Sequence, residues 1–411
     1  MTLRVDWRVS VGLVGTILKW LWVPLALPFA LALYDGTPIV PFLVPMVGTL
    51  LVGAGLERLP ETRDLRAREA FLMVALTWLS IALVGTVPFL LAGNGTLATP
   101  VNALFESMSG ITTTGATVVR DFEAHSRALL MWRQLLQWLG GLGILLLATA
   151  VLSRLSVAGA QLMESETREH TMTKLTPKIG ETAKIIVGLY IGLTAAATVV
   201  LFLMGVTGLA PEMTAYDAFA HALTAIATAG FSPRPESIGA FAPVVHWVVV
   251  VFMILGATNF ALLYALVQGD YRRLLESEEF WVYLGLLGGG SLLMIVLLIA
   301  DTGYEAGLLT TVRDSVFQIT SIVTTTGYAT ADFDTWSAAA KHVLFVGMFV
   351  GGMAGSTTCS IKALRWLIVA KSFRRDLMVA AHVDLVKPVR LSGEVVDEET
   401  IRDVYAYTLV A

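Results

Sequence analysis

Uninterrupted apolar segments recur along the whole chain and are separated by shorter polar stretches. A segment of about 20 apolar residues with few charges is long enough to cross the hydrocarbon core of a bilayer as a helix. We expect such helices near residues 11–33, 38–57, 70–92, 128–153, 182–209, 243–268, 279–300 and 338–370. The hydrophobic pattern therefore predicts an all-α, polytopic membrane protein.

The composition agrees with this pattern. Of the 411 residues, 56% are hydrophobic and 15% are charged, whereas about a quarter of the residues of soluble domains are charged. The single cysteine, Cys359, excludes an intrachain disulfide and a cysteine metal cluster. The first apolar segment has an alternative interpretation as a signal peptide cleaved after "ALA" at 30–32. We favour a membrane helix because the segment is long and a second apolar segment follows at once.

The placement of charge predicts an orientation. Lys and Arg residues gather in four loops, at 58–68, 154–184, 272–273 and 362–390. The positive-inside rule assigns these loops to the cytoplasm, so that the alternate segments face outward. Those alternate segments are rich in Asp and Glu, and an acidic outer mouth would concentrate cations. The alternative is that these acids are ordinary residues of exposed loops.

A polar motif occurs three times between the apolar segments. It reads "ITTTGAT" at 111–117, "IATAGFS" at 226–232 and "VTTTGYA" at 323–329. When the copies are superposed on their glycines, the preceding residues also align: Asn102, Asp217 and Asp314; Glu106, His221 and Gln318; Ser109, Thr224 and Ser321; Ile111, Ile226 and Val323. We expect the first of these sets to be helix N-caps. Each copy is predicted to be a half-helix of roughly ten residues, too short to span a membrane, followed by a Thr-x-Gly turn.

A long apolar segment stands on either side of each copy, which predicts a repeating unit of helix, re-entrant half-helix, extended loop and helix. Non-helical backbone at membrane depth is tolerated only where protein buries it or water reaches it. Units of this kind arranged around a centre build a pore. The less favoured alternative is that the three motifs are packing turns.

The motif suits the binding of a dehydrated cation. Backbone carbonyls of an extended segment can replace the ion's hydration shell, and glycine permits the positive φ that orients them. Threonine hydroxyls can add ligands or brace the loop, and the negative end of each half-helix dipole favours a cation. The absence of acids from the motifs favours a monovalent ion. The candidate ion ligands are Thr113, Thr114, Gly115, Thr228, Ala229, Gly230, Thr325, Thr326 and Gly327.

These motifs resemble the pore repeats of the Trk/Ktr/HKT superfamily of potassium transporters. "FESMSGITTTGAT" with "RQLLQWLGGLGILLLA" resembles the first repeat, "HALTAIATAGFS" with "ILGATNFALLY" the second, and "FQITSIVTTTGYAT" the third. "GGMAGSTTCSIKALR" at 351–365 resembles the broken middle of the third inner helix, which serves in that family as an intramembrane gate. The resemblance assigns the gating loop to Gly351, Gly352, Gly355, Ser356, Thr357 and Cys359.

The resemblance to the Trk branch also implies a domain organisation. Residues 1–57 would form an N-terminal two-helix extension, and 58–153, 154–268 and 269–370 three pore repeats. Residues 371–411 would form a cytosolic segment and the start of a fourth repeat. Two departures from the family stand out: Cys359 replaces a glycine, and a fourth filter would lie beyond Ala411. We therefore expect either a truncated chain or a second polypeptide that completes the pore.

The resemblance implies potassium uptake across the plasma membrane, with K⁺ preferred to Na⁺ because all three motifs carry glycine. It also implies a homodimer in membrane lipid that binds a cytosolic nucleotide-binding regulatory subunit. We expect no nucleic-acid partner, no covalently bound cofactor and no enzymatic activity. Three alternatives remain: a non-conducting subunit, a secondary transporter with inverted repeats, and an intramembrane enzyme using Ser356 with His342, whose residues would lie roughly 20 Å apart on one helix.

Overall fold

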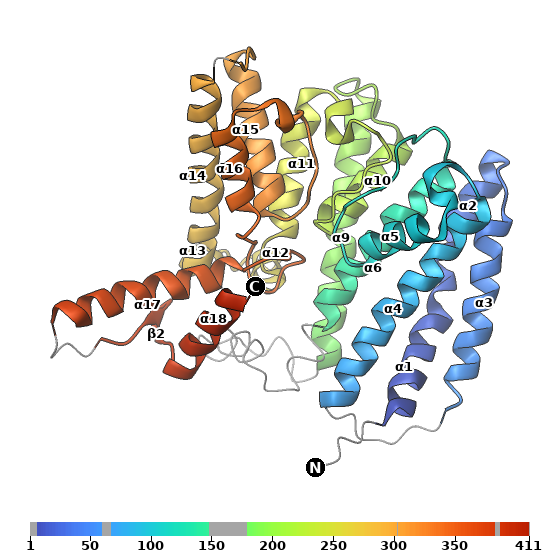
Figure 1. Cartoon of the computed structure of the whole chain (residues 1–411), viewed down its shortest axis with the longest axis horizontal. Coiled ribbons are helices and arrows are strands. Elements are labelled where there is room, and N and C mark those ends of the chain that lie inside the picture. Colours follow the sequence, from blue (N-terminus) through green and yellow to red (C-terminus); the bar gives the residue numbers. More distant parts are fainter. Residues whose placement is uncertain (1–5, 60–66, 148–178, 302, 383–386, 411) are drawn as a thin grey trace. The chain divides into compact units, whose positions relative to one another are not determined.

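The computed structural model (Figure 1) describes residues 6–59, 67–147, 179–301, 303–382 and 387–410. The chain divides into two compact units. The first unit comprises residues 1–141, 219–224 and 229–237, and the second comprises residues 142–218, 225–228 and 238–411. Each unit is described separately below.

The first unit is a bundle of apolar helices with one short helix packed against it. Its elements are α1 (Trp7–Trp20), α2 (Trp22–Asp35), α3 (Val40–Leu56), α4 (Ala67–Ala92), the 3₁₀ turn η1 (Gly95–Ala98), α5 (Pro100–Ile111) and most of α6 (Arg127–Leu147). Helices α1, α3 and α4 contact one another, and α5 packs on α4. Small residues let α1 and α3 approach closely, since a Cβ atom on Gly15 would lie 2.6 Å from Leu56 Cβ.

The second unit contains the remaining helices. They are α9 (Ile179–Val206), α10 (Ala215–Ile226, shared with the first unit), η3 (Ser237–Ala240), α11 (Pro243–Gly256), α12 (Phe260–Val267), α13 (Arg272–Glu276), α14 (Glu278–Ala300), α15 (Leu308–Val323), η4 (Phe333–Thr335), α16 (Ala338–Gly347), α17 (Ala363–Ala381) and α18 (Glu398–Val410). A two-stranded antiparallel hairpin, β1 (Arg390–Leu391) and β2 (Glu394–Val395), joins α17 to α18. Helix α15 packs on α11, α14 and α16.

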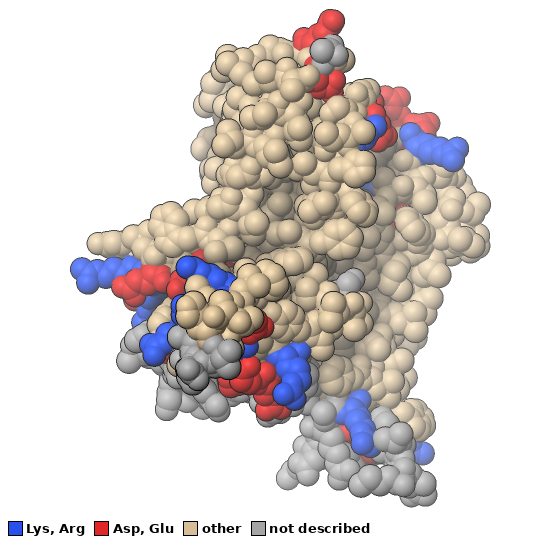
Figure 2. All heavy atoms as spheres, turned by 60° about the vertical axis from the view of Figure 1, so that its left-hand side comes forward, with Lys and Arg blue, Asp and Glu red and all other residues tan. Residues whose placement is uncertain are grey.

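The described helices confirm a multi-pass membrane fold. Five are long and apolar enough to cross a bilayer: Trp7–Asp35, Arg68–Ala92, Arg127–Leu147, Gly180–Val206 and Glu278–Ala300. Figure 2 shows a surface in the upper part of the view that is almost free of charged side chains, while the charged side chains gather at its upper edge and in the lower part of the view. An apolar surface of this kind is what a helix presents to lipid.

Two of the expected spans are broken. The segment expected at 243–268 bends by 107° between α11 and α12. Asn259 lies at the break, where its side chain caps α12 by accepting hydrogen bonds from the backbone N–H groups of Ala261 and Leu262. The segment expected at 338–370 is interrupted between Gly347 and Ala363, which confirms the break in the third inner helix.

The three predicted half-helices are present as α5, α10 and α15. They end at Ile111, Ile226 and Val323, which are the aligned positions of the three motifs. The N-cap prediction is wrong, because the helices begin earlier than the aligned residues Asn102, Asp217 and Asp314. Helix α5 begins at Pro100, and α10 begins after Thr214, whose hydroxyl pairs with the Asp217 carboxylate.

Candidate functional site

The three turns share one unusual backbone conformation. In each Thr-x-Gly turn, the threonine and the glycine both have a positive φ. The values are 57° for Thr113 and 77° for Gly115, 48° for Thr228 and 80° for Gly230, and 54° for Thr325 and 85° for Gly327. A positive φ is strained for a β-branched residue and persists only where the surroundings impose it. Its threefold recurrence confirms that the motifs form one repeated structure.

The hydrogen bonds of the three turns recur as well. In each, a hydroxyl on the half-helix donates to the carbonyl of the residue after the glycine: Ser109 to Ala116 (2.6 Å), Thr224 to Phe231 (3.0 Å) and Ser321 to Tyr328 (2.7 Å). The residue that carries this hydroxyl also accepts, through its backbone carbonyl, a hydrogen bond from the N–H of the residue before the glycine. The donors are Thr114 (3.0 Å), Ala229 (3.0 Å) and Thr326 (2.8 Å). Every turn is thus tied to the end of its own half-helix.

The helices that follow the first two turns, α6 and α11, are called inner helices here, and each lies against the backbone of the preceding half-helix. A Cβ atom on Gly140 would lie 2.1 Å from the carbonyl oxygen of Ile111, and one on Gly256 would lie 2.8 Å from that of Ile226. Because glycine has no side chain, α6 and α11 can lie directly against the ends of α5 and α10. Because these two glycines occupy equivalent places, they also align α6 with α11 residue by residue.

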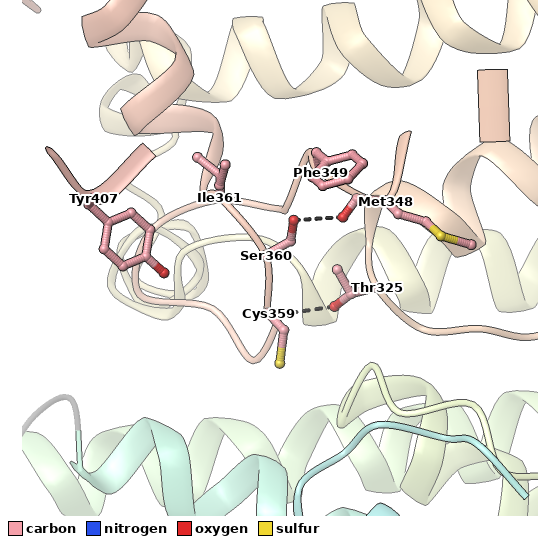
Figure 3. Close-up of a pocket in the computed structure, with 7 residues that line it drawn as sticks. All are labelled: Thr325, Met348, Phe349, Cys359, Ser360, Ile361 and Tyr407. Carbon is pink, nitrogen blue, oxygen red and sulfur yellow. Dashed lines mark hydrogen bonds between the residues drawn. The ribbon is translucent and has the colours of Figure 1, made fainter. Parts of the chain in front are cut away.

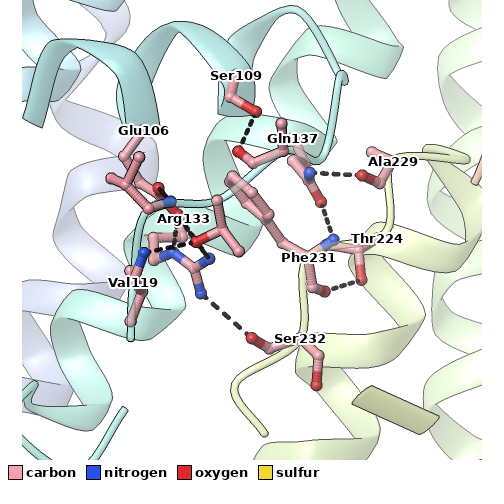
Figure 4. Close-up of polar contacts among 12 residues, drawn as sticks. Glu106, Ser109, Val119, Arg133, Gln137, Thr224, Ala229, Phe231 and Ser232 are labelled. Carbon is pink, nitrogen blue, oxygen red and sulfur yellow. Dashed lines mark hydrogen bonds and ion pairs between the residues drawn. The ribbon is translucent and has the colours of Figure 1, made fainter. Parts of the chain in front are cut away.

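A buried ion pair lies behind the first turn (Figure 4). Arg133 of α6 contacts Glu106 of α5, with Nε 2.7 Å from Oε1, and both side chains are at most 1% exposed. The Glu106 carboxylate also accepts hydrogen bonds from the Thr117 hydroxyl (2.8 Å) and the Val118 N–H group (3.0 Å). A buried charge is tolerated only when it is paired and hydrogen-bonded, and this network meets both conditions.

The same helix reaches the second turn. Arg133 Nη1 donates to the Ser232 carbonyl at 3.2 Å, and its guanidinium lies 4.2 Å from the centroid of the Phe231 ring. Gln137 donates through Nε2 to the Ala229 carbonyl at 2.6 Å and accepts the Phe231 N–H at 2.9 Å (Figure 4). Our sequence analysis did not identify Arg133 or Gln137. The available signal was a charged residue within an apolar span, which is a marker of function by itself.

Within the second unit, the loop between α16 and α17 contacts the backbone of the second inner helix and half-helix. Thr357 donates through Oγ1 to the carbonyls of Gly256 (3.0 Å) and Ile226 (3.2 Å), and its hydroxyl lies 3.0 Å from the Thr228 hydroxyl. The Met353 N–H donates to the Ala257 carbonyl at 2.9 Å. The loop is therefore seated in the break between α11 and α12.

The loop also contacts the third turn. The Cys359 N–H donates to the Thr325 hydroxyl at 3.0 Å. These two residues line a pocket in the second unit (Figure 3), together with Met348, Phe349, Ser360, Ile361 and Tyr407. The Cys359 side chain is exposed. The residues expected for the ion site and those expected for the gate are thus in direct contact at Thr228–Thr357 and at Thr325–Cys359.

Two ionisable side chains, the buried Glu279 and the partly buried Lys362, hold the loop in place. Glu279 of α14 accepts a hydrogen bond from the Ala354 N–H at 2.7 Å. Lys362 donates through Nζ to the Thr358 hydroxyl at 2.8 Å and contacts the Thr358 carbonyl. Neither residue was among the expected site residues. The loop therefore has a defined conformation imposed by side chains of both the loop and its neighbouring helix.

The predicted gate residues lie in this one loop, but the enzyme alternative finds no support in it. Ser356 donates to the Met353 carbonyl at 2.6 Å, while His342 Nδ1 lies 2.6 Å from the carbonyl of Ala338 in its own helix. Each of these two side chains is engaged locally, so Ser356 and His342 do not form the hydrogen-bonded pair that the enzyme alternative requires.

Comparisons with known proteins agree with the repeated architecture. A family model described as TrkH, cation transport protein, matches residues 44–303 and 305–411. The Trk system potassium uptake protein TrkH of Escherichia coli (strain K12) is 32% identical over 401 residues, which cover 92% of this chain and 81% of the relative. The corresponding protein of Halomonas elongata is 33% identical, over 97% of this chain and 82% of the relative.

A solved structure extends the likeness to three dimensions. The crystal structure of the potassium transporter TrkH from Vibrio parahaemolyticus matches with a TM-score of 0.86 and 30% sequence identity, over 98% of this chain and 82% of that chain. The match of sequence and fold across nearly the whole chain, together with the three equivalent turns, shows that the chain belongs to the TrkH family of cation transport proteins.

Proposed function

We propose that this chain takes up potassium ions across the plasma membrane along a path lined by its three Thr-x-Gly turns. The relatives in Escherichia coli and Halomonas elongata are named as potassium uptake proteins, and cation transport is the activity of the family. The observation that carries the proposal is the repeated backbone of the turns, with positive φ at Thr113 and Gly115 and at the equivalent pairs.

The backbone suits a cation because the sign of φ alternates along each turn. In an ordinary strand successive carbonyls point to opposite sides in a regular pattern, and positive φ at the threonine and the glycine departs from that pattern, so that individual carbonyls can be turned towards an ion. The half-helix ends at Ile111, Ile226 and Val323 add partial negative charge beside each turn. Uncharged oxygens of this kind suit a monovalent cation, and the glycines favour K⁺ over Na⁺.

Rubidium uptake into cells that lack their own potassium uptake systems tests this function. We would express the 411-residue chain alone and with an appended fourth pore repeat, and compare each with its Gly115→Ser and Gly327→Ser variants. Saturable uptake by at least one form, lost in both glycine variants at equal expression, supports the proposal. Absence of uptake in both forms would overturn it and leave the alternative of a non-conducting subunit that only assembles with partners.

The loop at 348–362 is proposed to gate the path. Its hydrogen bonds to Thr228 and Thr325 support this role, because a loop that moves must release or shift both turns. Cys359 supplies a test without further engineering, since it is the single cysteine of the chain and is exposed. A cationic methanethiosulfonate reagent should reduce rubidium uptake by the wild type and leave Cys359→Ser unaffected. Modification that is complete by mass and leaves uptake unchanged would contradict the gate.

The remaining proposals concern assembly and orientation. Basic loops such as 272–273 are proposed to face the cytoplasm, with the turns opening outward. We further propose a homodimer that binds a cytosolic nucleotide-binding regulatory subunit. Cross-linking of purified protein in lipid nanodiscs tests the dimer, and a pull-down with such a regulatory subunit, with and without nucleotide, tests the second partner.

A further inference from the structure

Gln137 fixes the orientation of two consecutive peptide groups in the second turn. Its Nε2 donates to the carbonyl of Ala229, and its Oε1 accepts the N–H of Phe231, so that one side-chain amide spans Gly230. Gln137 is fully buried, and its contacts are 2.6 and 2.9 Å long.

The direction of the Gly230 carbonyl follows from this contact. The C=O and N–H groups of a trans peptide point in opposite directions, and the peptide that joins Gly230 to Phe231 directs its N–H at Gln137. The Gly230 carbonyl is therefore turned away from α6. The Ala229 carbonyl, in contrast, is turned towards α6 and is already engaged by Gln137.

Neighbouring contacts hold the rest of the segment. Thr224 donates to the Phe231 carbonyl at 3.0 Å, and Arg133 donates to the Ser232 carbonyl at 3.2 Å. Since these bonds surround Gly230 on both sides, its own carbonyl is the one that the segment presents in a fixed direction. A carbonyl held in this way needs little reorganisation to bind an ion, and a fixed set of ligands is one way in which a site distinguishes ions of equal charge and different size.

This brace belongs to the junction between the first and second repeats. The equivalence of Gly140 and Gly256 places Met253 of α11 at the position of Gln137, and Val249 at the position of Arg133. Met253 and Val249 are buried and apolar, and cannot hydrogen-bond a turn. The polar brace is therefore a specific feature of α6 and is not a general requirement of the fold.

We propose that Gln137 is a positioning residue for ion selectivity, which holds the Gly230 carbonyl towards the ion from outside the second repeat. The proposal rests on the potassium-uptake function proposed above. According to this proposal, a side chain of the first repeat sets the direction of an ion-binding carbonyl in the second repeat. It predicts that loss of the amide impairs the discrimination of Rb⁺ from Na⁺ more than it impairs accumulation of the protein.

The test is the ratio of Rb⁺ to Na⁺ uptake by Gln137→Met, which has nearly the same volume and matches the residue found in α11. We expect the ratio to fall about tenfold, as expected when one net hydrogen bond to a ligand is lost. The matched control is Gln134→Met on the same helix. Gln134 is equally buried, and neither of its amide atoms has a hydrogen-bond partner in the structure, so its ratio should not change.

A second variant guards against misfolding. Gln137→Asn withdraws the amide from both backbone atoms and keeps a polar side chain, and it should lower the ratio in the same direction. A wild-type ratio in either variant at normal membrane abundance would overturn the proposal. Failure of both variants to accumulate would also overturn it, because Gln137 would then be a folding residue. Absence of uptake by the wild type would instead contradict the proposed function.

Discussion

The hydroxyl groups of Thr228 and Thr357 lie 3.0 Å apart, although the two residues are separated by 129 positions in the chain. Thr228 has a positive φ and begins the second turn, while Thr357 belongs to the loop that interrupts the third inner helix. One hydrogen bond therefore connects the proposed ion site with the proposed gate. Because of this contact, a movement of the loop would also shift the second turn.

Thr357→Val should loosen this connection. The substitution preserves the shape of the side chain and removes the hydroxyl that donates to the Gly256 and Ile226 carbonyls. We expect a loss of about 1–3 kcal/mol of stability and a higher rate of rubidium uptake, because the loop leaves its seat more readily. Thr207→Val is the control, since the Thr207 hydroxyl donates only to carbonyls in the last turn of α9, which directly precedes it. Unchanged uptake and melting temperature in Thr357→Val would contradict the coupling.

Breaking the ion pair between Arg133 and Glu106 should strongly destabilise the folded protein. Arg133→Met leaves the Glu106 carboxylate buried without its counter-charge, at an expected loss of about 3–5 kcal/mol. The double variant Arg133→Met/Glu106→Gln removes both charges and should melt at a higher temperature than Arg133→Met alone. Thermal melting of purified protein in detergent measures both changes.

A partly exposed ion pair of another arginine on the same helix is the control for that experiment. Arg127 pairs with Asp35, and its side chain is half exposed. Arg127→Met should therefore change stability by less than about 1 kcal/mol. If Arg133→Met and Arg127→Met proved equally mild, the buried pair would not hold the first turn.

Gly115 and Gly327 should differ in their tolerance of alanine. Both have positive φ, so that each alanine variant costs about 1–2 kcal/mol in backbone strain. A Cβ atom on Gly115 would in addition lie 2.3 Å from the Ala229 carbonyl oxygen, whereas one on Gly327 would have no atom within 4 Å. We expect Gly115→Ala to abolish rubidium uptake and Gly327→Ala to reduce it partially.

Gly269→Ala separates the effect of backbone strain from the effect of the contact with the Ala229 carbonyl. Gly269 has a φ of 87° and open space around it, and it lies outside the three turns. Its alanine variant should therefore show the stability loss of Gly327→Ala without the loss of uptake. Equal uptake by Gly115→Ala and Gly327→Ala would show that the contact with Ala229 has no role.

His125 should make the protein sensitive to acid. It lies in the segment between α5 and α6, is 6% exposed, and has no hydrogen-bond partner on either ring nitrogen. Burial, and secondarily the charge of Arg133, lower the pKa of His125 from its ordinary value of 6.5. The neutral ring is thus favoured in the folded state.

The sign of the effect follows from this lowered pKa. The folded protein keeps its full stability above the pKa of the unfolded state, near 6.5, and loses stability as the pH falls towards the lower pKa of the folded state. The melting temperature of the wild type should therefore drop between pH 7.5 and pH 5.5, and the drop should be smaller in His125→Asn. The same drop in both proteins would assign the acid sensitivity to other groups.

Periodicity revealed most of the secondary structure. The apolar segments predicted the long helices, because a helix in lipid must be apolar over its whole length. The recurring glycines predicted the three half-helices and their turns, and alignment on those glycines placed Ser109, Thr224 and Ser321 at equivalent hydrogen bonds. The expected N-caps were wrong because helix starts depend on local competition between cap residues, such as Thr214, that alignment does not capture.

The contacts that position the site could not be read from the sequence. Gln137 and Ala229 are 92 residues apart, and Thr228 and Thr357 are 129 residues apart. Such pairs have no spacing that identifies them, because the distance between two residues in space depends on how several helices pack together. Local patterns therefore determined which elements form and which turns repeat, since these depend on neighbours along the chain. Tertiary packing alone decided that Gln137 holds Gly230 in place, and that the loop at 348–362 is seated against the second and third turns.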